Sequence, residues 1–196
     1  MNLINFFENI KAKIPIGIKI PRNVVLSRFF ELVQTENGEI LHQSGKICRI
    51  AIYIEKGVLR QYSFTDSGAE RTYQIAMEGE WVSDLESFIE QQPSTRNIEV
   101  IEGGRIWIVT YEKFKGASQS IPFIDYFFNR LVKRITFKLQ QQNAEIMEMT
   151  LEERYMKLMK EHPEYFQRVP LKILATYFGV EKQSLSRLRR RIQSNK

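Results

Sequence analysis

The sequence predicts an α+β protein made of an N-terminal antiparallel β-roll, a long helix and a C-terminal helix–turn–helix unit. Three observations lead to this fold class. Short apolar segments separated by turn residues fill residues 37–110. An unbroken amphipathic stretch follows, and the last quarter of the chain has the pattern of two short helices joined at a glycine. The expected units are residues 1–119, 120–148 and 149–196.

The beginning of the chain reads as helix with breaks. Pro15 and Pro21 interrupt it, because proline lacks the N–H that a helix interior requires. The segment Val24–Val33 has the apolar spacing of a short amphipathic helix. We therefore expect helices before the first strand.

The β-roll is predicted from alternating segments that end at turn residues. The expected strands are Arg49–Ile54, Val58–Phe64, Tyr73–Ala76, Ile98–Ile101 and Ile106–Val109. Turns are expected at Glu55–Gly57 and Glu102–Gly104, where glycines follow charged residues. Short strands at such spacing are typical of a closed or sandwiched antiparallel jelly roll.

A long helix is predicted after the roll. One apolar stripe runs along it, formed by Ile124, Phe128, Leu131, Ile135 and Leu139. From Ile121 to Met147 nothing breaks the helix, which at 1.5 Å per residue would be about 40 Å long. Because this exceeds what one small roll needs, we expect a dimerisation helix whose stripe also meets the same helix of a second copy. The alternative is that the stripe packs only on its own roll.

The C-terminal unit begins at a capping box, in which Thr150 and Glu153 exchange hydrogen bonds. Its first helix extends to about Lys160. Two further helices cross at a corner, where Ala175 is small enough for close contact and Gly179 ends the first of them. This arrangement is typical of a DNA-binding helix–turn–helix.

The second of these helices has an outward polar face. Its predicted members are Lys182, Gln183, Ser184, Arg187 and Arg190. Of the chain's net charge of +6, residues 150–196 carry all of it, with 11 basic and 5 acidic residues. A neutral body with a basic terminal unit favours phosphate binding by that unit. A solvated basic terminus is the alternative interpretation.

Composition excludes several other functions. Cys48 is the only cysteine, so the chain has no internal disulfide, cannot build an iron–sulfur site alone, and fits a reducing cytoplasm. No membrane span or secretion signal is found. With His42 and His162 as its two histidines, the chain lacks the ligands of a metal enzyme and the histidines of a serine-type triad. We expect no catalytic residues, no metal and no cofactor.

The ordered parts resemble the cyclic-AMP receptor protein and fumarate–nitrate regulator (CRP/FNR) family of bacterial transcription factors. The best-fitting stretches are Ile40–Gly45, Tyr53–Gly57, Asp66–Glu70 and Glu78–Trp81. The resemblance implies a cyclic-nucleotide-binding-like jelly roll and a homodimer that binds double-stranded DNA at pseudo-palindromic sites, with RNA polymerase as a partner if the regulator is an activator. It also implies that Lys182, Gln183 and Arg187 face base edges, that Ser184 contacts a phosphate or base, and that Lys172 and Thr176 contact phosphates.

The effector pocket that the resemblance implies is altered. Cyclic-nucleotide binders of this family carry Gly-Glu-Leu and, about ten residues later, Arg-Ser/Thr-Ala. Here the matching residues are Ser83, Asp84 and Leu85, then Ser94, Thr95 and Arg96. A buried phosphate without a paired cation is costly, so we expect an unknown small-molecule effector other than cyclic AMP. The competing function is a sensor module that signals through a protein partner, although the basic helix lacks the apolar anchors of such a surface.

Overall fold

The computed structural model describes residues 29–194 of the 196-residue chain. The helices expected before residue 29 lie outside this range. Within it, the prediction that helix continues to Val33 is wrong, because Glu31–Gln34 forms strand β1 and pairs with the last long strand. Apolar residues such as Leu32 and Val33 occur both in short amphipathic helices and in edge strands. Here the hydrogen bonds to the sheet make the segment a strand.

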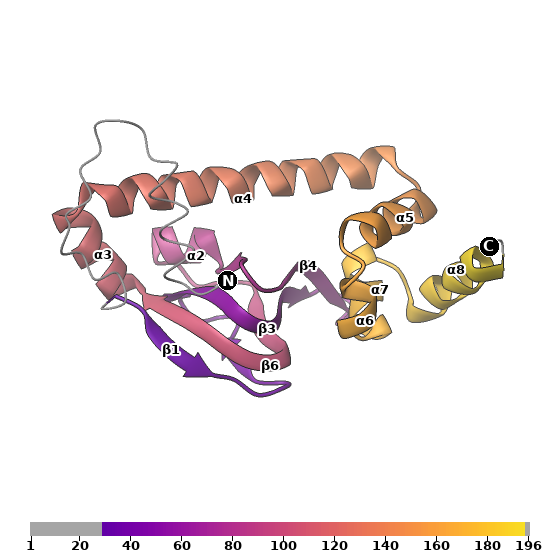
Figure 1. The fold of residues 1–196 in the computed structure, drawn as a ribbon, viewed down its shortest axis with the longest axis horizontal. Coiled ribbons are helices and arrows are strands. Elements are labelled where there is room, and N and C mark those ends of the chain that lie inside the picture. Colours follow the sequence, from indigo (N-terminus) through magenta and orange to yellow (C-terminus); the bar gives the residue numbers. More distant parts are fainter. Residues whose placement is uncertain (1–28, 195–196) are drawn as a thin grey trace.

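The strands form one antiparallel sheet that curls into a roll (Figure 1). They are β1 (Glu31–Gln34), β2 (Ile40–His42), β3 (Ile50–Phe64), β4 (Glu70–Ala76), β5 (Trp81–Val82) and β6 (Asn97–Thr110). The order is β1-β6-β3-β4, with β2 also on β6 and β5 also on β3. The α+β class with an antiparallel roll is confirmed.

The two long strands β3 and β6 run straight through the predicted turns. At Glu55–Gly57 and Glu102–Gly104 the pairing shifts register as bulges, and neither strand reverses. Gly57 has φ +118°, and a Cβ there would lie 2.6 Å from the Glu102 carbonyl oxygen. A Cβ on Gly104 would likewise collide with the backbone of β3. These glycines therefore allow the backbones of two bulged strands to approach closely. Glycine is common at such bulges as well as in turns, which is why the sequence pattern suggested turns.

Seven helices complete the described part of the chain. They are α2 (Leu85–Glu90), α3 (Tyr111–Ser120), α4 (Pro122–Glu148), α5 (Leu151–Glu161), α6 (Tyr165–Arg168), α7 (Leu171–Phe178) and α8 (Lys182–Ser194). Both bonds of the capping box at Thr150 and Glu153 are present. Gly179 ends α7 in the left-handed conformation, with φ +71°. No helix in residues 29–194 has the length and apolar character to cross a membrane.

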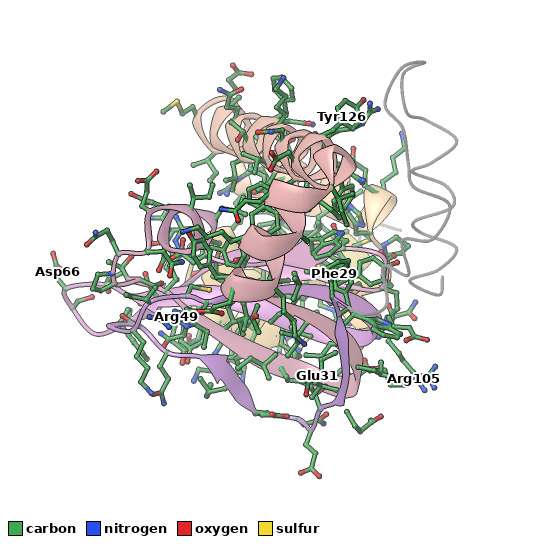
Figure 2. The ribbon with its side chains drawn as sticks, turned by 90° about the vertical axis from the view of Figure 1, so that its left-hand side faces the viewer. Phe29, Glu31, Arg49, Asp66, Arg105 and Tyr126 are labelled. Atoms are coloured by element: carbon green, nitrogen blue, oxygen red, sulfur yellow. The ribbon has the colours of Figure 1, made fainter. Side chains whose placement is uncertain are left out.

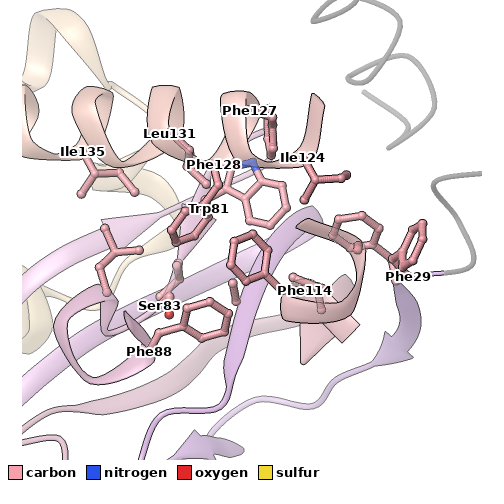
Figure 3. Close-up of a pocket in the computed structure, with 16 residues that line it drawn as sticks. Phe29, Trp81, Ser83, Phe88, Phe114, Ile124, Phe127, Phe128, Leu131 and Ile135 are labelled. Atoms are coloured by element: carbon pink, nitrogen blue, oxygen red, sulfur yellow. The ribbon is translucent and has the colours of Figure 1, made fainter. Parts of the chain in front are cut away.

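The apolar stripe of α4 lies on the roll. Ile124, Phe128 and Leu131 pack with Trp81 and Phe88 in one cluster (Figure 3). A cavity of about 40 Å³ remains there, also lined by Ile135, whereas Leu139 lies further along the helix and is 39% exposed. Three of the five residues predicted for dimerisation, Ile124, Phe128 and Leu131, thus face the roll of their own chain.

The C-terminal helices share a core with the roll. Val58, Ile75 and Met77 of the roll belong to the same buried cluster as Tyr155 and Leu174 of α5 and α7. In Figure 1 the far end of β4 meets α6 and α7, while α8 stands furthest from the sheet. The helix–turn–helix therefore packs directly on the roll.

Candidate nucleic-acid interface and roll pocket

Helix α8 presents its polar side to solvent because its apolar side is fully used. Leu185, Leu188 and Ile192 are buried against α5 and α7, at spacings of three and four residues. All five residues predicted to face outward, Lys182, Gln183, Ser184, Arg187 and Arg190, are exposed. Guanidinium, amide and hydroxyl groups on one helix face match the donors and acceptors of base edges and phosphates.

The residues predicted on α7 behave differently from each other. Lys172 is exposed. Thr176 is half-buried, and its hydroxyl lies 2.7 Å from the Thr72 hydroxyl of β4 while donating to the Ile173 carbonyl at 2.8 Å. A phosphate contact by Thr176 would require the bond to the roll to break, so Lys172 is the better candidate.

A groove runs between the helix–turn–helix and the turn that joins β3 to β4. This turn, which carries Asp66, projects from the roll (Figure 2). The groove has a volume of about 640 Å³ and is lined by Lys172, Lys182 and Gln183 on one side and Arg71 on the other. Arg71 therefore adds a cation from the roll near Lys182 at the N-terminal end of α8, where Glu70 and Glu181 also line the groove.

The predicted roll pocket contains a hydrogen-bonded group built on two buried residues. Asp84 and Ser94 are 5% and 4% exposed, and the Ser94 hydroxyl donates to the Asp84 carboxylate at 2.5 Å. The Arg96 backbone N–H donates to the Ser94 oxygen at 2.9 Å. Ser94 stands where the resemblance would place a phosphate-binding arginine. Without that arginine, the charged group at this place is the Asp84 carboxylate, which is negative.

The other pocket residues are separated from this pair. The Ser83 hydroxyl donates to the Ile50 carbonyl at 2.9 Å, Leu85 lines the apolar cavity under α4, and Thr95 is exposed. The Arg96 guanidinium donates to Gln61 at 3.1 Å and stacks 4.8 Å from the centre of the Tyr73 ring. The structure therefore brings Asp84, Ser94 and the Arg96 backbone together and leaves Ser83, Leu85 and Thr95 outside.

Two further buried groups lie in the roll, and the sequence had not connected them with the pocket. His42 and Asn97 are 7% and 8% exposed, and neither His42 Nε2 nor Asn97 Nδ2 has a hydrogen-bond partner. Burial lowers the pKa of His42, which Asp84 raises and Lys46 lowers further. Nothing in the local sequence of His42 indicates that it lies buried near Asp84.

Cys48 lies buried in the roll. Burial raises the pKa of the Cys48 thiol, which favours its unreactive protonated form. Within residues 29–194, no three His, Cys, Asp or Glu side chains gather as a metal site.

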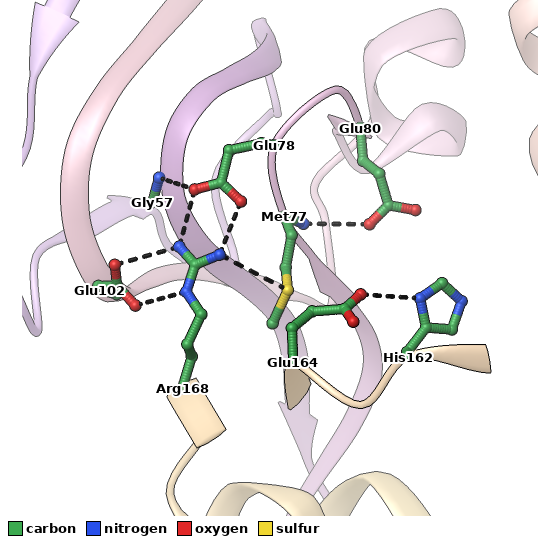
Figure 4. Close-up of polar contacts among 8 residues, drawn as sticks. All are labelled: Gly57, Met77, Glu78, Glu80, Glu102, His162, Glu164 and Arg168. Atoms are coloured by element: carbon green, nitrogen blue, oxygen red, sulfur yellow. Dashed lines mark hydrogen bonds and ion pairs between the residues drawn. The ribbon is translucent and has the colours of Figure 1, made fainter. Parts of the chain in front are cut away.

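An arginine clamp joins the helical unit to the roll (Figure 4). Arg168 of α6 donates to both carboxylate oxygens of Glu78 at 2.7 Å and to those of Glu102 at 2.8 and 3.1 Å. Glu78 also accepts from the Gly57 N–H at 2.9 Å. Arg168 lowers the pKa of Glu78 to about 2. The sequence offers no signal for this contact, since its members are far apart in the chain.

Comparisons with known proteins agree with this architecture. Residues 32–120 match the family described as Cyclic nucleotide-binding domain. A structure described as a transcriptional regulator of the CRP/FNR family from Eubacterium rectale aligns with a TM-score of 0.72 and 18% identity, covering 97% of this chain and 88% of that one. A search of curated protein sequences found no match.

Two further solved structures share the fold. CLP, a c-di-GMP responsive global regulator from Xanthomonas campestris, has a TM-score of 0.69 and 15% identity, covering 87% of this chain and 89% of that one. FixK2 from Bradyrhizobium japonicum has a TM-score of 0.71 and 11% identity, covering 85% of each chain. At these identities the likeness is one of fold, and it extends over both the roll and the C-terminal helices.

Proposed function

We propose that this chain, which has the fold of CRP/FNR-family regulators, is a DNA-binding transcription regulator that acts as a homodimer on pseudo-palindromic sites. The observation that carries the proposal is the exposed polar face of α8. Five side chains that can bind bases and phosphates are exposed on one side of this helix. Its other side is buried through Leu185, Leu188 and Ile192. Because it acts on DNA, the protein is assigned to the cytoplasm, and RNA polymerase is a partner if it activates.

The outward face of α4 supports the homodimer. Residues spaced alternately by four and three run along it: Tyr126, Arg130, Lys133, Phe137, Gln140, Ala144 and Met147. This is the spacing of a two-helix seam. Phe137 and Met147 are 67% and 86% exposed, which is unusual for such large apolar side chains on a 27-residue helix. A second copy of the same helix would cover them by two-fold symmetry.

The roll is proposed to bind an effector that is not a cyclic nucleotide whose phosphate pairs with a buried arginine. The Asp84 carboxylate bonded to Ser94 places negative charge where a cyclic phosphate would need a cation. Arg96 is already engaged by Gln61 and Tyr73. We assign the roll a regulatory role without catalysis, and its effector is an unidentified small molecule.

The test is selection of bound duplexes from a random library by the purified protein, without ligand, at about 150 mM salt, where nonspecific phosphate binding is weak. Enrichment of a two-fold symmetric sequence is the expected result. Enrichment of an unsymmetric site would contradict the homodimer arrangement. If no sequence is enriched and the protein also fails to bind random duplexes at low salt, where phosphate binding needs no effector, the DNA function is wrong and a sensor that acts on a protein partner replaces it.

A further inference from the structure

A cavity lies at the junction of the three parts of the molecule. It has a volume of about 300 Å³ and lies between β4, the C-terminal half of α4 and helices α5 to α7. Figure 1 shows how these elements converge where β4 meets the helical unit beneath α4. Cavities of this size and larger hold small organic ligands in proteins. This cavity is separate from the Asp84–Ser94 group in the roll.

The cavity wall carries an excess of positive charge. Lys157 is neutralised by Glu145, at 2.5 Å, and by Glu161, at 3.9 Å. Arg154 is not: its Nε is buried without a hydrogen-bond partner, and one Nη donates to the Phe178 carbonyl at a long 3.4 Å. An anion in the cavity would give the Arg154 guanidinium the charged partner that the described residues do not supply.

A second arginine lines the cavity from the roll. Arg71 of β4 forms no ion pair with any other described residue, and its side chain is exposed. It also lines the neighbouring groove beside α8. Two guanidinium groups from different units, Arg71 and Arg154, therefore border one cavity without a carboxylate of their own. Such a pair suits phosphate or carboxylate oxygens, which accept bidentate hydrogen bonds.

The rest of the wall is largely apolar and aromatic. Leu139 and Ile146 of α4 line the cavity while remaining 39% and 48% exposed. Tyr177 and Phe178 lie on the opposite side, and the Tyr177 hydroxyl accepts from Gln142 of α4 at 2.9 Å. Burial raises the pKa of Tyr177 to about 12, so its hydroxyl stays protonated and does not repel an anion.

We propose that this junction cavity binds a small organic anion, in which a phosphate or carboxylate group meets Arg71 and Arg154 and an apolar or aromatic body packs on Leu139, Ile146 and Tyr177. The ligand would touch the roll, the long helix and the helix–turn–helix at once. It therefore stabilises the arrangement in which these three enclose it. That such binding alters DNA affinity rests on the proposed function, whereas the binding itself does not.

The test is a fluorescence titration of the full chain with naphthyl phosphate, in the absence of DNA, compared with uncharged naphthol. We expect saturable binding of one naphthyl phosphate per chain, weakened by added salt, and at least tenfold weaker binding of naphthol. Arg154→Gln and Arg71→Gln are each expected to weaken naphthyl phosphate binding about tenfold, as the loss of a charged hydrogen-bonding partner does.

Arg105→Gln is the matched control, because it removes the same charge from an exposed arginine that pairs with Glu55 elsewhere on the roll. It should leave binding unchanged. Should Arg154→Gln fail to fold, the exposed Arg71→Gln decides the matter alone. No saturable binding, or equal weakening by Arg105→Gln and Arg71→Gln, would overturn the proposal. Because no DNA is present, these outcomes are independent of whether the duplex selection succeeds.

Discussion

The proposed function gives two exposed cations, Arg187 and Lys172, different roles. Arg187 lies on the outward face of α8, and Lys172 lies on α7, one helix further from the expected groove of the DNA. A planar guanidinium can pair with guanine O6 and N7, whereas an ammonium group attracts phosphates without regard to sequence.

We predict that Arg187→Ala relaxes sequence preference at one base pair of each half-site. The loss should be about 1–3 kcal/mol on the preferred site and much smaller on random DNA, because a base-specific contact is removed. Competition binding with single-base variants of the selected site measures it. Equal losses on specific and random duplexes would show that Arg187 contacts phosphate instead.

Lys172→Ala is the companion variant. It should weaken binding to all sequences alike and reduce the dependence of affinity on salt by about one phosphate contact. A change of sequence preference in this variant would remove the distinction between the two residues.

His42 gives the roll a pH-dependent stability. Burial lowers its pKa, so the folded roll keeps His42 neutral while the unfolded chain takes up a proton below about pH 6.5. The stabilisation is complete above that pH and is lost as the pH falls toward the lower folded pKa, by at most about 1.4 kcal/mol per pH unit.

Urea unfolding at pH 7.5 and 5.5 tests this prediction. His42→Gln, which cannot titrate, should lose less stability between the two conditions than the unaltered protein. His162→Gln is the control, because His162 is 40% exposed beside Glu164 on the helical unit. An identical acid-side loss in the His42→Gln variant would show that other groups cause it.

Helix α4 carries one apolar stripe against the roll and two exposed apolar side chains on its outward face. Its predicted stripe covers the roll through Ile124, Phe128 and Leu131, and its outward face holds Phe137 and Met147. In Figure 2 the labelled Tyr126 lies on the side of α4 away from the roll. A 27-residue helix has enough turns for both contacts.

Phe137→Glu is expected to convert the dimer to monomers, since it would place two carboxylates near the symmetry axis of the seam. Analytical ultracentrifugation or light scattering at micromolar concentration measures the change. The matched control is Phe64→Glu, because Phe64 is 58% exposed at the end of β3 and away from α4. A dimer that survives Phe137→Glu would exclude the outward face of α4 as the seam.

Across the whole molecule, the Arg168 clamp and a shared core fix the helix–turn–helix on the roll. Arg168→Ala removes four charge-assisted hydrogen bonds and leaves Glu78 and Glu102 close together without a cation. We expect it to lower the free energy of unfolding by roughly 1.5–3 kcal/mol.

Denaturant unfolding of Arg168→Ala measures this loss, with Arg105→Ala as the control, since an exposed pair contributes at most about 1 kcal/mol. The clamp also predicts acid sensitivity. Arg168 depresses the pKa of Glu78, so this part of the stability is present above about pH 4.5 and is lost as the pH falls toward 2. A neutral effect of Arg168→Ala would leave the apolar core as the main contact.

The sequence by itself determined the local features, because each depends on residues near one another in the chain. The capping box at Thr150, the end of α7 at Gly179 and the division of α8 into buried and exposed faces were all predicted correctly. The order of roll, long helix and helix–turn–helix followed from changes of period along the chain.

Only the tertiary structure decided what depends on residues brought together from distant positions. Gly57 and Gly104 lie at bulges because the backbones of the paired strands β3 and β6 approach each other closely there. The roll packs against Ile124, Phe128 and Leu131 of the α4 stripe. Ser94 donates a hydrogen bond to Asp84, and Arg168 forms ion pairs with Glu78 and Glu102 across the interface. A sequence pattern specifies which face of an element is apolar or charged, but the partner of that face is chosen by long-range packing.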